Sequence, residues 1–323
     1  MKKIHLFTVF ILLTSILSSN FSVSASTRSP KILVAGDSIS SGYGLEGYPD
    51  GIVENYGRLF ASSVGSLEGD SYINLSVDGE TSAGLLWRIE NSPKTVFSGF
   101  DAVIVSSGGN DLIDSLLPSV ISIIAEFSGG SYRDADLLVK LNLASEKFFS
   151  SAKKTGEDVY RNLSSALSAL RNQNPSAYLA VLSIYDPFDD NSNKGALKLI
   201  DKALIAPCID LLNSYIKKSA EENGFDYIDV DSLFSGRAGT LTNIKSLDIH
   251  PNAEGHLLIS DGILKSYRDF KSKDAFLEIG YPRDKDSFAR TALGIATIAG
   301  ATLFGCASIV ISFGKYRVKL KDE

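Results

Sequence analysis

The feature that most limits the fold of this chain is a series of short apolar runs that alternate with amphipathic stretches. The apolar runs are rich in β-branched residues and end at Gly, Asp, Asn or Pro, which is typical of buried parallel strands. They cover residues 31–35, 72–77, 102–106, 178–184 and 227–230. Helical patterns cover 56–64, 157–171 and 204–223. This alternation predicts an α/β fold with a doubly wound parallel sheet between two layers of helices.

The beginning of the chain has the pattern of a secretory signal. Lys2 and Lys3 precede an apolar run at 6–17, and small residues lead up to Ala25. This order predicts a signal peptide over 1–25 that is cleaved after Ala25. The alternative is an uncleaved N-terminal membrane anchor.

The end of the chain predicts a membrane anchor. Residues 291–314 carry no charge and are long enough to cross a bilayer core as one helix. A basic tail at 315–323 follows, so we expect it in the cytoplasm and the main domain, 26–283, outside. Residues 284–290 would form a polar linker. The alternative is a buried C-terminal helix of the main domain.

Charge and cysteine content exclude several classes of protein. The formal net charge of −6 argues against a nucleic-acid partner, because a duplex binder needs a basic face. The cysteines are Cys208 and Cys306, with no CxxC pair and no Cys/His cluster. We therefore expect buried thiols, no zinc or other metal site, and no cofactor.

Several residues just after the predicted strands can carry chemistry. Ligands of such sheets bind outside the carboxyl ends of the strands. The sequence places there the segments 36–38 (GDS), 78–81 (DGET), 108–111 (GGND) and 248–252 (DIHPN). Together they supply a serine, glycines, an asparagine and a histidine to one edge of the sheet.

These residue types suit acyl transfer. Ser38 needs a base to accept its proton, and His250 has a suitable ordinary pKa. The amides of Ser38 and Gly79 and the side chain of Asn110 can stabilise an oxyanion. Taken singly, each has a simpler role: Ser38 can cap a helix, Gly79 and Asn110 can occupy turns, and His250 can lie on the surface.

Neighbouring residues have supporting roles. Asp37 and Asp111 are expected to brace the edge by bonding loop amides. His256 is expected to be a packing or surface residue. Tyr43 and Trp87 can line a cleft, although core or surface positions are equally consistent with the pattern. Residues 116–127 are expected to form an additional helix, with a lid as the alternative.

The motifs and their order resemble those of the SGNH hydrolases, the GDSL lipase and esterase superfamily. The resemblance runs from about residue 31 to 267 and lies in GDS, the later glycine, GGND and IHPNAEGH. It implies a flavodoxin-like five-stranded sheet and hydrolysis of esters or thioesters. It also implies Ser38 as nucleophile, Gly79 and Asn110 as oxyanion donors, and His250 as base. The G-x-S-x-G motif is absent, which argues against an α/β-hydrolase with a nucleophile elbow.

One position departs from the family pattern. The family usually has an orienting Asp three residues before the histidine, where this chain has Leu247. Asp248 lies only two residues before His250. We favour Asp248 as the partner of the imidazole, and a backbone carbonyl near Leu247 is the alternative.

Together these observations predict a membrane-anchored, extracytoplasmic esterase or lipase that works through an acyl-serine intermediate. Its substrate would be a lipid or an acylated glycan. Two alternatives remain at this stage. One is a non-catalytic surface binding module on the same fold. The other is an acyltransferase, which would pass the acyl group to an acceptor other than water.

Overall fold

The structure is a computed structural model that describes residues 28–116 and 134–278. The predicted signal peptide, linker, membrane helix and basic tail lie outside these ranges, as does all but the first residue of the predicted helix 116–127. Within the described ranges, no helix combines the length and apolar character needed to span a membrane. The chain divides into two units after Ser266, and the first unit contains the whole sheet.

A five-stranded parallel sheet is the centre of the first unit. Its strands are β1 (Ile32–Gly36), β2 (Tyr72–Asn74), β3 (Ala102–Ser106), β4 (Tyr178–Leu182) and β5 (Asp226–Ile228). They lie in the order β2-β1-β3-β4-β5, and all four pairings are parallel. This order is flavodoxin-like and reverses direction between β1 and β3, where such sheets bind ligands. The predicted α/β class and parallel sheet are confirmed.

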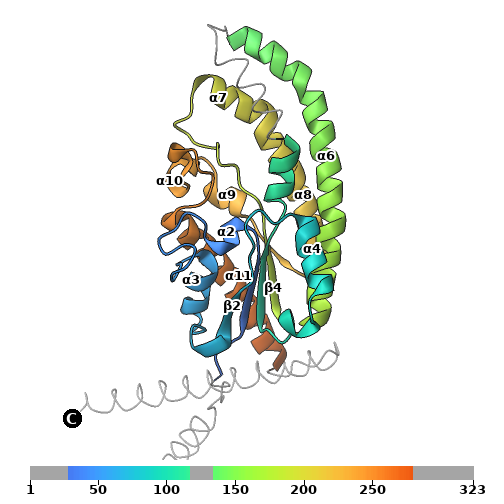
Figure 1. Ribbon diagram of the computed structural model, residues 1–323, viewed down its shortest axis with the longest axis vertical. Coiled ribbons are helices and arrows are strands. Elements are labelled where there is room, and N and C mark those ends of the chain that lie inside the picture. The colour runs from blue at the N-terminus through green and yellow to red at the C-terminus, as the bar shows by residue number, and fades with distance from the viewer. Residues whose placement is uncertain (1–27, 117–133, 279–323) are drawn as a thin grey trace, which may run out of the picture. The chain divides into compact units, whose positions relative to one another are not determined.

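Helices and short helical turns connect the strands (Figure 1). The α-helices are α2 (Ser38–Ser41), α3 (Tyr56–Ser63), α4 (Ser82–Asn91), α6 (Asp134–Gln173), α7 (Gly195–Ile200), α8 (Ala206–Glu222), α9 (Val230–Phe234), α10 (Ala238–Leu241) and α11 (Ala253–Glu278). The shorter 3-10 helices are η1 (Gly69–Ser71), η2 (Lys94–Val96) and η4 (Ile244–Ser246), and η3 (Asp201–Ile205) is a π-helix. Residues 109–116 are also helical.

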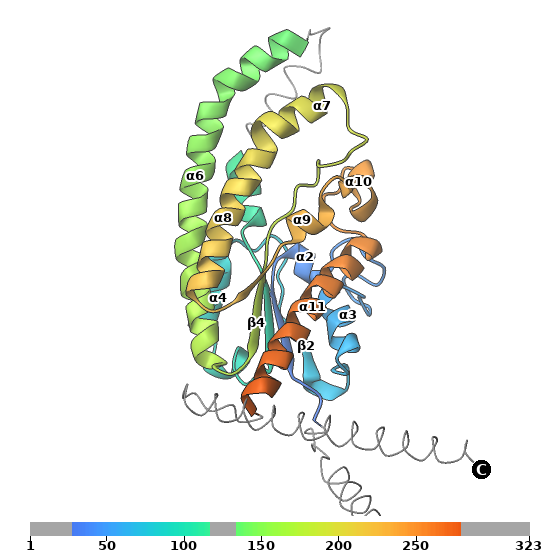
Figure 2. The ribbon, with the colours of Figure 1, turned by 180° about the vertical axis from the view of Figure 1, so that it is seen from behind.

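Helices cover both faces of the sheet. Figures 1 and 2 show α4, α6 and α8 on one face and α3 and the first part of α11 on the other. Alternate residues of β1 serve the two faces, because successive side chains of a strand point in opposite directions. Leu33 belongs to the core under α4, α6 and α8. Val34 faces α3, where a Cβ on Gly57 would lie 2.6 Å from its Cγ2 atom. The alternation of side chains along a buried strand therefore supplies apolar residues to the core on each face of the sheet.

Helix α6 extends beyond the part that the sequence pattern predicted. The pattern indicated 157–171, whereas the helix runs through 40 residues, which is about 60 Å at 1.5 Å per residue. Its earlier half packs Leu141, Phe148 and Ala152 against the α7–α8 region in a second, smaller core that also buries Cys208. The sequence pattern did not predict this half, because only a narrow stripe of its side chains is buried and that stripe packs only in the smaller core.

Candidate active site

A glycine brings Ser38 to the carboxyl edge of the sheet. A Cβ on Gly36, the last residue of β1, would lie 2.2 Å from the carbonyl oxygen of Ser106 in β3, so only glycine allows the two strands to pair at this level. Asp37 then caps α2, accepting a hydrogen bond from the Ile39 amide at 3.2 Å. Ser38 is therefore the first residue of a helix that begins directly outside the strand.

Polar side chains from neighbouring elements hold α2 in place. The Ser106 hydroxyl donates to Asp37 at 3.2 Å. Asn55 and Asn74 donate their side-chain amides to the carbonyl oxygen of Ser40, at 3.1 and 2.8 Å. Burial raises the pKa of Asp37 to about 6, because the loss of hydration around its carboxylate outweighs the hydrogen bonds from Ser106 and from backbone amides.

His250 meets Ser38 although 212 residues separate them in the sequence. The Nε2 atom of His250 lies 2.8 Å from Ser38 Oγ. The loop that carries the histidine is fixed by backbone bonds: the Asn243 amide donates to the His250 carbonyl at 2.9 Å, and Thr242 pairs with Pro251. The serine hydroxyl and the imidazole are thus within hydrogen-bond distance for proton transfer.

Asp248 lies at the other nitrogen of the imidazole. Its Oδ1 atom is 2.5 Å from His250 Nδ1 and also accepts the His250 backbone amide at 3.0 Å. The turn is made by Leu247, which has a left-handed backbone (φ 60°) and an exposed side chain. Desolvation acts to raise the pKa of Asp248, but the hydrogen bonds from His250 outweigh it, and the net shift is downward. The carboxylate is therefore charged at neutral pH.

Tyr43 covers one side of the imidazole. Its ring centroid lies 4.6 Å from that of His250, at an interplanar angle of 38°. Tyr43 follows Gly42, the left-handed C-cap of α2, so the turn that ends α2 also brings the phenol ring to the histidine. Trp87, the other aromatic residue considered from the sequence, is exposed on α4.

The loop after β2 carries Gly79 to the same edge. Backbone pairing with β1 continues beyond β2, since the Val77 amide donates to the Gly36 carbonyl at 2.8 Å. Gly79 then adopts a left-handed backbone (φ 74°) with no atom within 4 Å of a hypothetical Cβ. Its surroundings are therefore open to a substrate.

Asn110 and Asp111 hold that loop. The Asn110 side-chain amide donates to the Glu80 carbonyl at 3.0 Å, which leaves its second N–H for another acceptor. The two oxygens of Asp111 accept the Ser82 amide and hydroxyl at 2.8 and 2.7 Å. The structure thus brings Ser38, Gly79, Asn110 and His250 to one edge, where together they present a nucleophile, a base and amide donors.

His256 has a packing position, as predicted. It is fully buried, and its Nδ1 atom accepts the backbone amide of Tyr56 at 3.2 Å. Burial, followed by the nearby His250, lowers the pKa of His256 to about 3. The ring is therefore neutral and joins α11 to the beginning of α3.

The sequence interpretation missed an acidic cluster at the carboxyl ends of β4 and β5, made of Asp186, Asp201 and Asp231. Asp186 and Asp201 are buried with their carboxyl groups close enough to interact, and Asp231 accepts the Asp186 amide at 3.0 Å. Burial, then the neighbouring Asp201, raises the pKa of Asp186 to about 8. The sequence held a signal for this cluster, because Asp186 lies two residues after the fourth predicted strand.

Taken together, a serine, a histidine and a carboxylate joined by hydrogen bonds on a flavodoxin-like sheet define the class as a serine hydrolase. The family profile described as "GDSL-like Lipase/Acylhydrolase family" matches residues 34–258, which is most of the chain. The chain therefore belongs to that family and is a serine ester hydrolase.

Solved structures agree on the fold. A phospholipase A1 from Streptomyces albidoflavus NA297 is 21% identical, with a TM-score of 0.51, over 75% of this chain and 99% of that one. An extracellular lipase from Streptomyces rimosus is also 21% identical, with a TM-score of 0.50, over 74% and 99%. A comparison with curated proteins gave no match. At this level of identity the likeness concerns the fold alone.

Proposed function

We propose that the chain hydrolyses carboxylic esters through an acyl-enzyme formed on Ser38, with His250 as general base and Asp248 as the group that orients and stabilises the imidazole. The observation that carries this proposal is the continuous series of contacts from Ser38 Oγ to His250 Nε2, at 2.8 Å, and from His250 Nδ1 to Asp248 Oδ1, at 2.5 Å.

The first half of the reaction forms the acyl-enzyme. Ser38 Oγ attacks the carbonyl carbon while its proton passes to His250 Nε2, and the carbonyl oxygen becomes an oxyanion. The Ser38 and Gly79 amides and the free N–H of Asn110 would stabilise this charge. His250 then returns the proton to the departing alcohol, and the Asp248 carboxylate stabilises the imidazolium in between.

The second half releases the acid. Water loses a proton to His250 and attacks the acyl carbon, which regenerates Ser38. If an alcohol replaced water, the same residues would perform acyl transfer. Product analysis in the presence of competing alcohols distinguishes the two outcomes, since a transferase yields a new ester rather than free acid.

Ser38→Ala tests the assignment. We expect kcat/KM for 4-nitrophenyl acetate to fall by about 10⁴-fold or more, since the variant has no nucleophile. A fluorophosphonate probe should add to Ser38 in the wild type, as seen by peptide mass, and not to the variant. Ser63→Ala, at an exposed position of α3, is the matched control and should keep labelling and turnover. Retained turnover in Ser38→Ala would refute the mechanism.

We also propose an extracytoplasmic location with a single C-terminal membrane anchor. Its support is the sequence alone: the signal pattern over 1–25 and the uncharged stretch 291–314. Fractionation of cells that express the full chain tests it. Release of the protein from membranes by cleavage within 284–290, with activity retained in the soluble fraction, is the expected result.

A further inference from the structure

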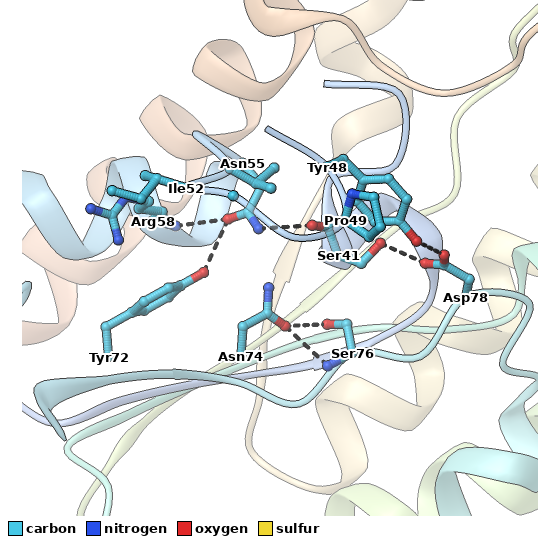
Figure 3. Close-up of a pocket in the computed structure, with 12 residues that line it drawn as sticks. Ser41, Tyr48, Pro49, Ile52, Asn55, Arg58, Tyr72, Asn74, Ser76 and Asp78 are labelled. Atoms are coloured by element: carbon cyan, nitrogen blue, oxygen red, sulfur yellow. Dashed lines mark hydrogen bonds between the residues drawn. The ribbon is translucent and has the colours of Figure 1, made fainter. Parts of the chain in front are cut away.

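A polar cavity of 480 Å³ lies beside the site, between β2 and the loop that connects α2 to α3 (Figure 3). The mechanism proposed above makes no use of it. Its floor is formed by Tyr72, Asn74 and Ser76, which point to the same side because they alternate along an extended strand. The intervening residues Ile73 and Leu75 face the opposite way and pack on the main core.

The lining of this cavity suits a polyhydroxylated ligand rather than an acyl chain. All of its lining residues except Pro49, Gly51, Ile52 and Val53 carry a side-chain group that can form hydrogen bonds. An acyl chain needs a predominantly apolar wall, which this cavity does not offer. Tyr48 and Tyr72 each add an aromatic body with a polar end, which can contact both the C–H face and the hydroxyls of a sugar ring.

The lining groups are also fixed before any ligand binds. Asp78 accepts hydrogen bonds from the hydroxyls of Ser41, at 2.6 Å, and of Tyr48. The Tyr72 hydroxyl donates to Asn55 at 3.0 Å. Arg58 uses its Nε atom for Glu54 at 3.1 Å, and among the described residues its terminal guanidinium nitrogens have no partner. Fixed polar groups with unused capacity lower the entropic cost of binding.

Two contacts place the cavity next to the reacting atoms. The Ser41 hydroxyl oxygen, which lines the cavity and donates to Asp78, lies 3.0 Å from the carbonyl oxygen of Ser38. Tyr48, another lining residue, has its ring centroid 5.2 Å from that of Tyr43, which in turn covers the His250 imidazole. The cavity is thus one layer of side chains from the nucleophile and its base.

We infer that this cavity is a subsite for the sugar part of an acylated carbohydrate, so that the alcohol released from the ester is a glycan hydroxyl. The inference rests on the proposed hydrolysis at Ser38 and adds the substrate class to it. The size fits, since small-molecule sites occupy about 300–1,000 Å³.

A pair of acetyl esters tests the inference. 4-Nitrophenyl acetate and mono-O-acetylated methyl glucopyranosides, as a mixture of positional isomers, yield the same acetyl-enzyme and differ only in the alcohol. The double variant Arg58→Ala/Ser76→Leu removes the guanidinium group with its unused terminal N–H donors and fills the floor. We expect the ratio of kcat/KM for the sugar ester to kcat/KM for the nitrophenyl ester to fall at least tenfold in this variant.

Trp87→Ala is the matched control, because Trp87 is exposed on α4 and does not line the cavity. It should leave both rates and their ratio unchanged. An unchanged ratio in the double variant would overturn the inference. So would wild-type protein that hydrolyses the nitrophenyl ester but no acetylated glucoside, or a double variant that changes only the preference for acyl-chain length. The proposed function would stand in all three cases.

A binding measurement separates this inference from failure of the hydrolysis itself. The Ser38→Ala variant cannot turn over, so calorimetric titration with the acetylated glucosides reports binding without hydrolysis. Binding that is lost on adding Arg58→Ala/Ser76→Leu supports the subsite. Binding that is absent, or unaffected by these changes, overturns it whatever the outcome of the turnover assays.

Discussion

Two stretches of the same sheet edge gather carboxylates and use them differently. Near Ser38, two carboxylates are held by N–H or O–H donors: Asp248 accepts two bonds from His250, and Asp111 accepts two from Ser82. At the ends of β4 and β5, Asp186 and Asp201 are buried against each other. Donors keep a carboxylate charged and fix its direction, whereas burial beside another acid favours the protonated form.

Among the changes that test this comparison, Asp248→Asn has the largest expected effect. An amide at this position can donate to His250 Nδ1 and so favour the tautomer that cannot accept the Ser38 proton. We expect kcat for 4-nitrophenyl acetate to fall by about 10²–10⁴-fold with little change in KM. Steady-state kinetics measures this, and circular dichroism confirms that the fold is intact.

The control for this variant is Asp70→Asn. Asp70 is exposed in η1, before β2, so its carboxylate has no route to the site. It should leave kcat unchanged. If Asp248→Asn kept nearly full turnover, a different group would have to orient the imidazole. The charge of Asp248 would then have no role in catalysis.

Asp186→Asn tests the second stretch of the edge, where carboxyl groups are buried beside each other. The pKa of Asp186 is higher in the folded chain, about 8, than its ordinary 3.8, so the folded state binds more protons between these values. Stability therefore falls as the pH rises through this window. Asn stays neutral and still donates to Asp201. The variant should gain at least about 1 kcal/mol over wild type at pH 9, or about 2–4 °C in Tm.

Thermal unfolding between pH 5 and pH 9 provides the measurement. The difference between wild type and Asp186→Asn should be small at pH 5 and grow with pH. Other charges face the pair, namely Asp189, Asp231, Lys198 and Lys202, and they are present in both proteins. Parallel Tm profiles for the two proteins would show that the pair does not share a proton.

The smallest effect concerns the turn that directs the Asp248 carboxylate. Leu247 is 92% exposed and has a left-handed backbone, which costs a non-glycine residue about 1–2 kcal/mol. Leu247→Gly relieves that strain but adds freedom to the unfolded chain, so we expect a gain in the free energy of unfolding of at most about 1 kcal/mol. Turnover should fall less than threefold.

An exposed leucine in a regular helix gives the matched control. Leu257 is 51% exposed in α11, and Leu257→Gly should destabilise the protein by about 1 kcal/mol. Chemical denaturation of both variants measures the two values. Equal destabilisation by both substitutions would mean that the turn at Leu247 is not strained.

The sheet could be predicted from the sequence because buried parallel strands leave a strong local signal. The range 102–106 coincides with β3, and the other predicted strands overlap β1, β2, β4 and β5. The range 72–77 ends three residues beyond β2, and 227–230 ends two beyond β5, because Val230 begins α9 instead of ending the strand. An apolar side chain at this position can be buried in the same core whether it ends a strand or begins a helix, so the pattern does not distinguish the two.

The positions of Ser38 and His250 could be inferred because both follow elements whose ends must meet at one edge. Other features depend on contacts that no local pattern records. Asp201 lies outside the predicted helix 204–223, at the start of the π-helix η3, and its interaction with Asp186 could not be read from a local pattern. The partner of the His250 ring was left open for the same reason, since the left-handed Leu247 determines which oxygen reaches the ring.

The nucleophile depends on an outer strand for its placement. The carbonyl of Ser40 accepts a hydrogen bond from the Asn74 side-chain amide in β2, which lies at the end of the sheet and, among the described strands, pairs with β1 only. Outer strands open at lower free energies than central ones. On heating, this enzyme should therefore lose activity before it loses its helical signal, and recover activity on cooling if heating stops between the two transitions.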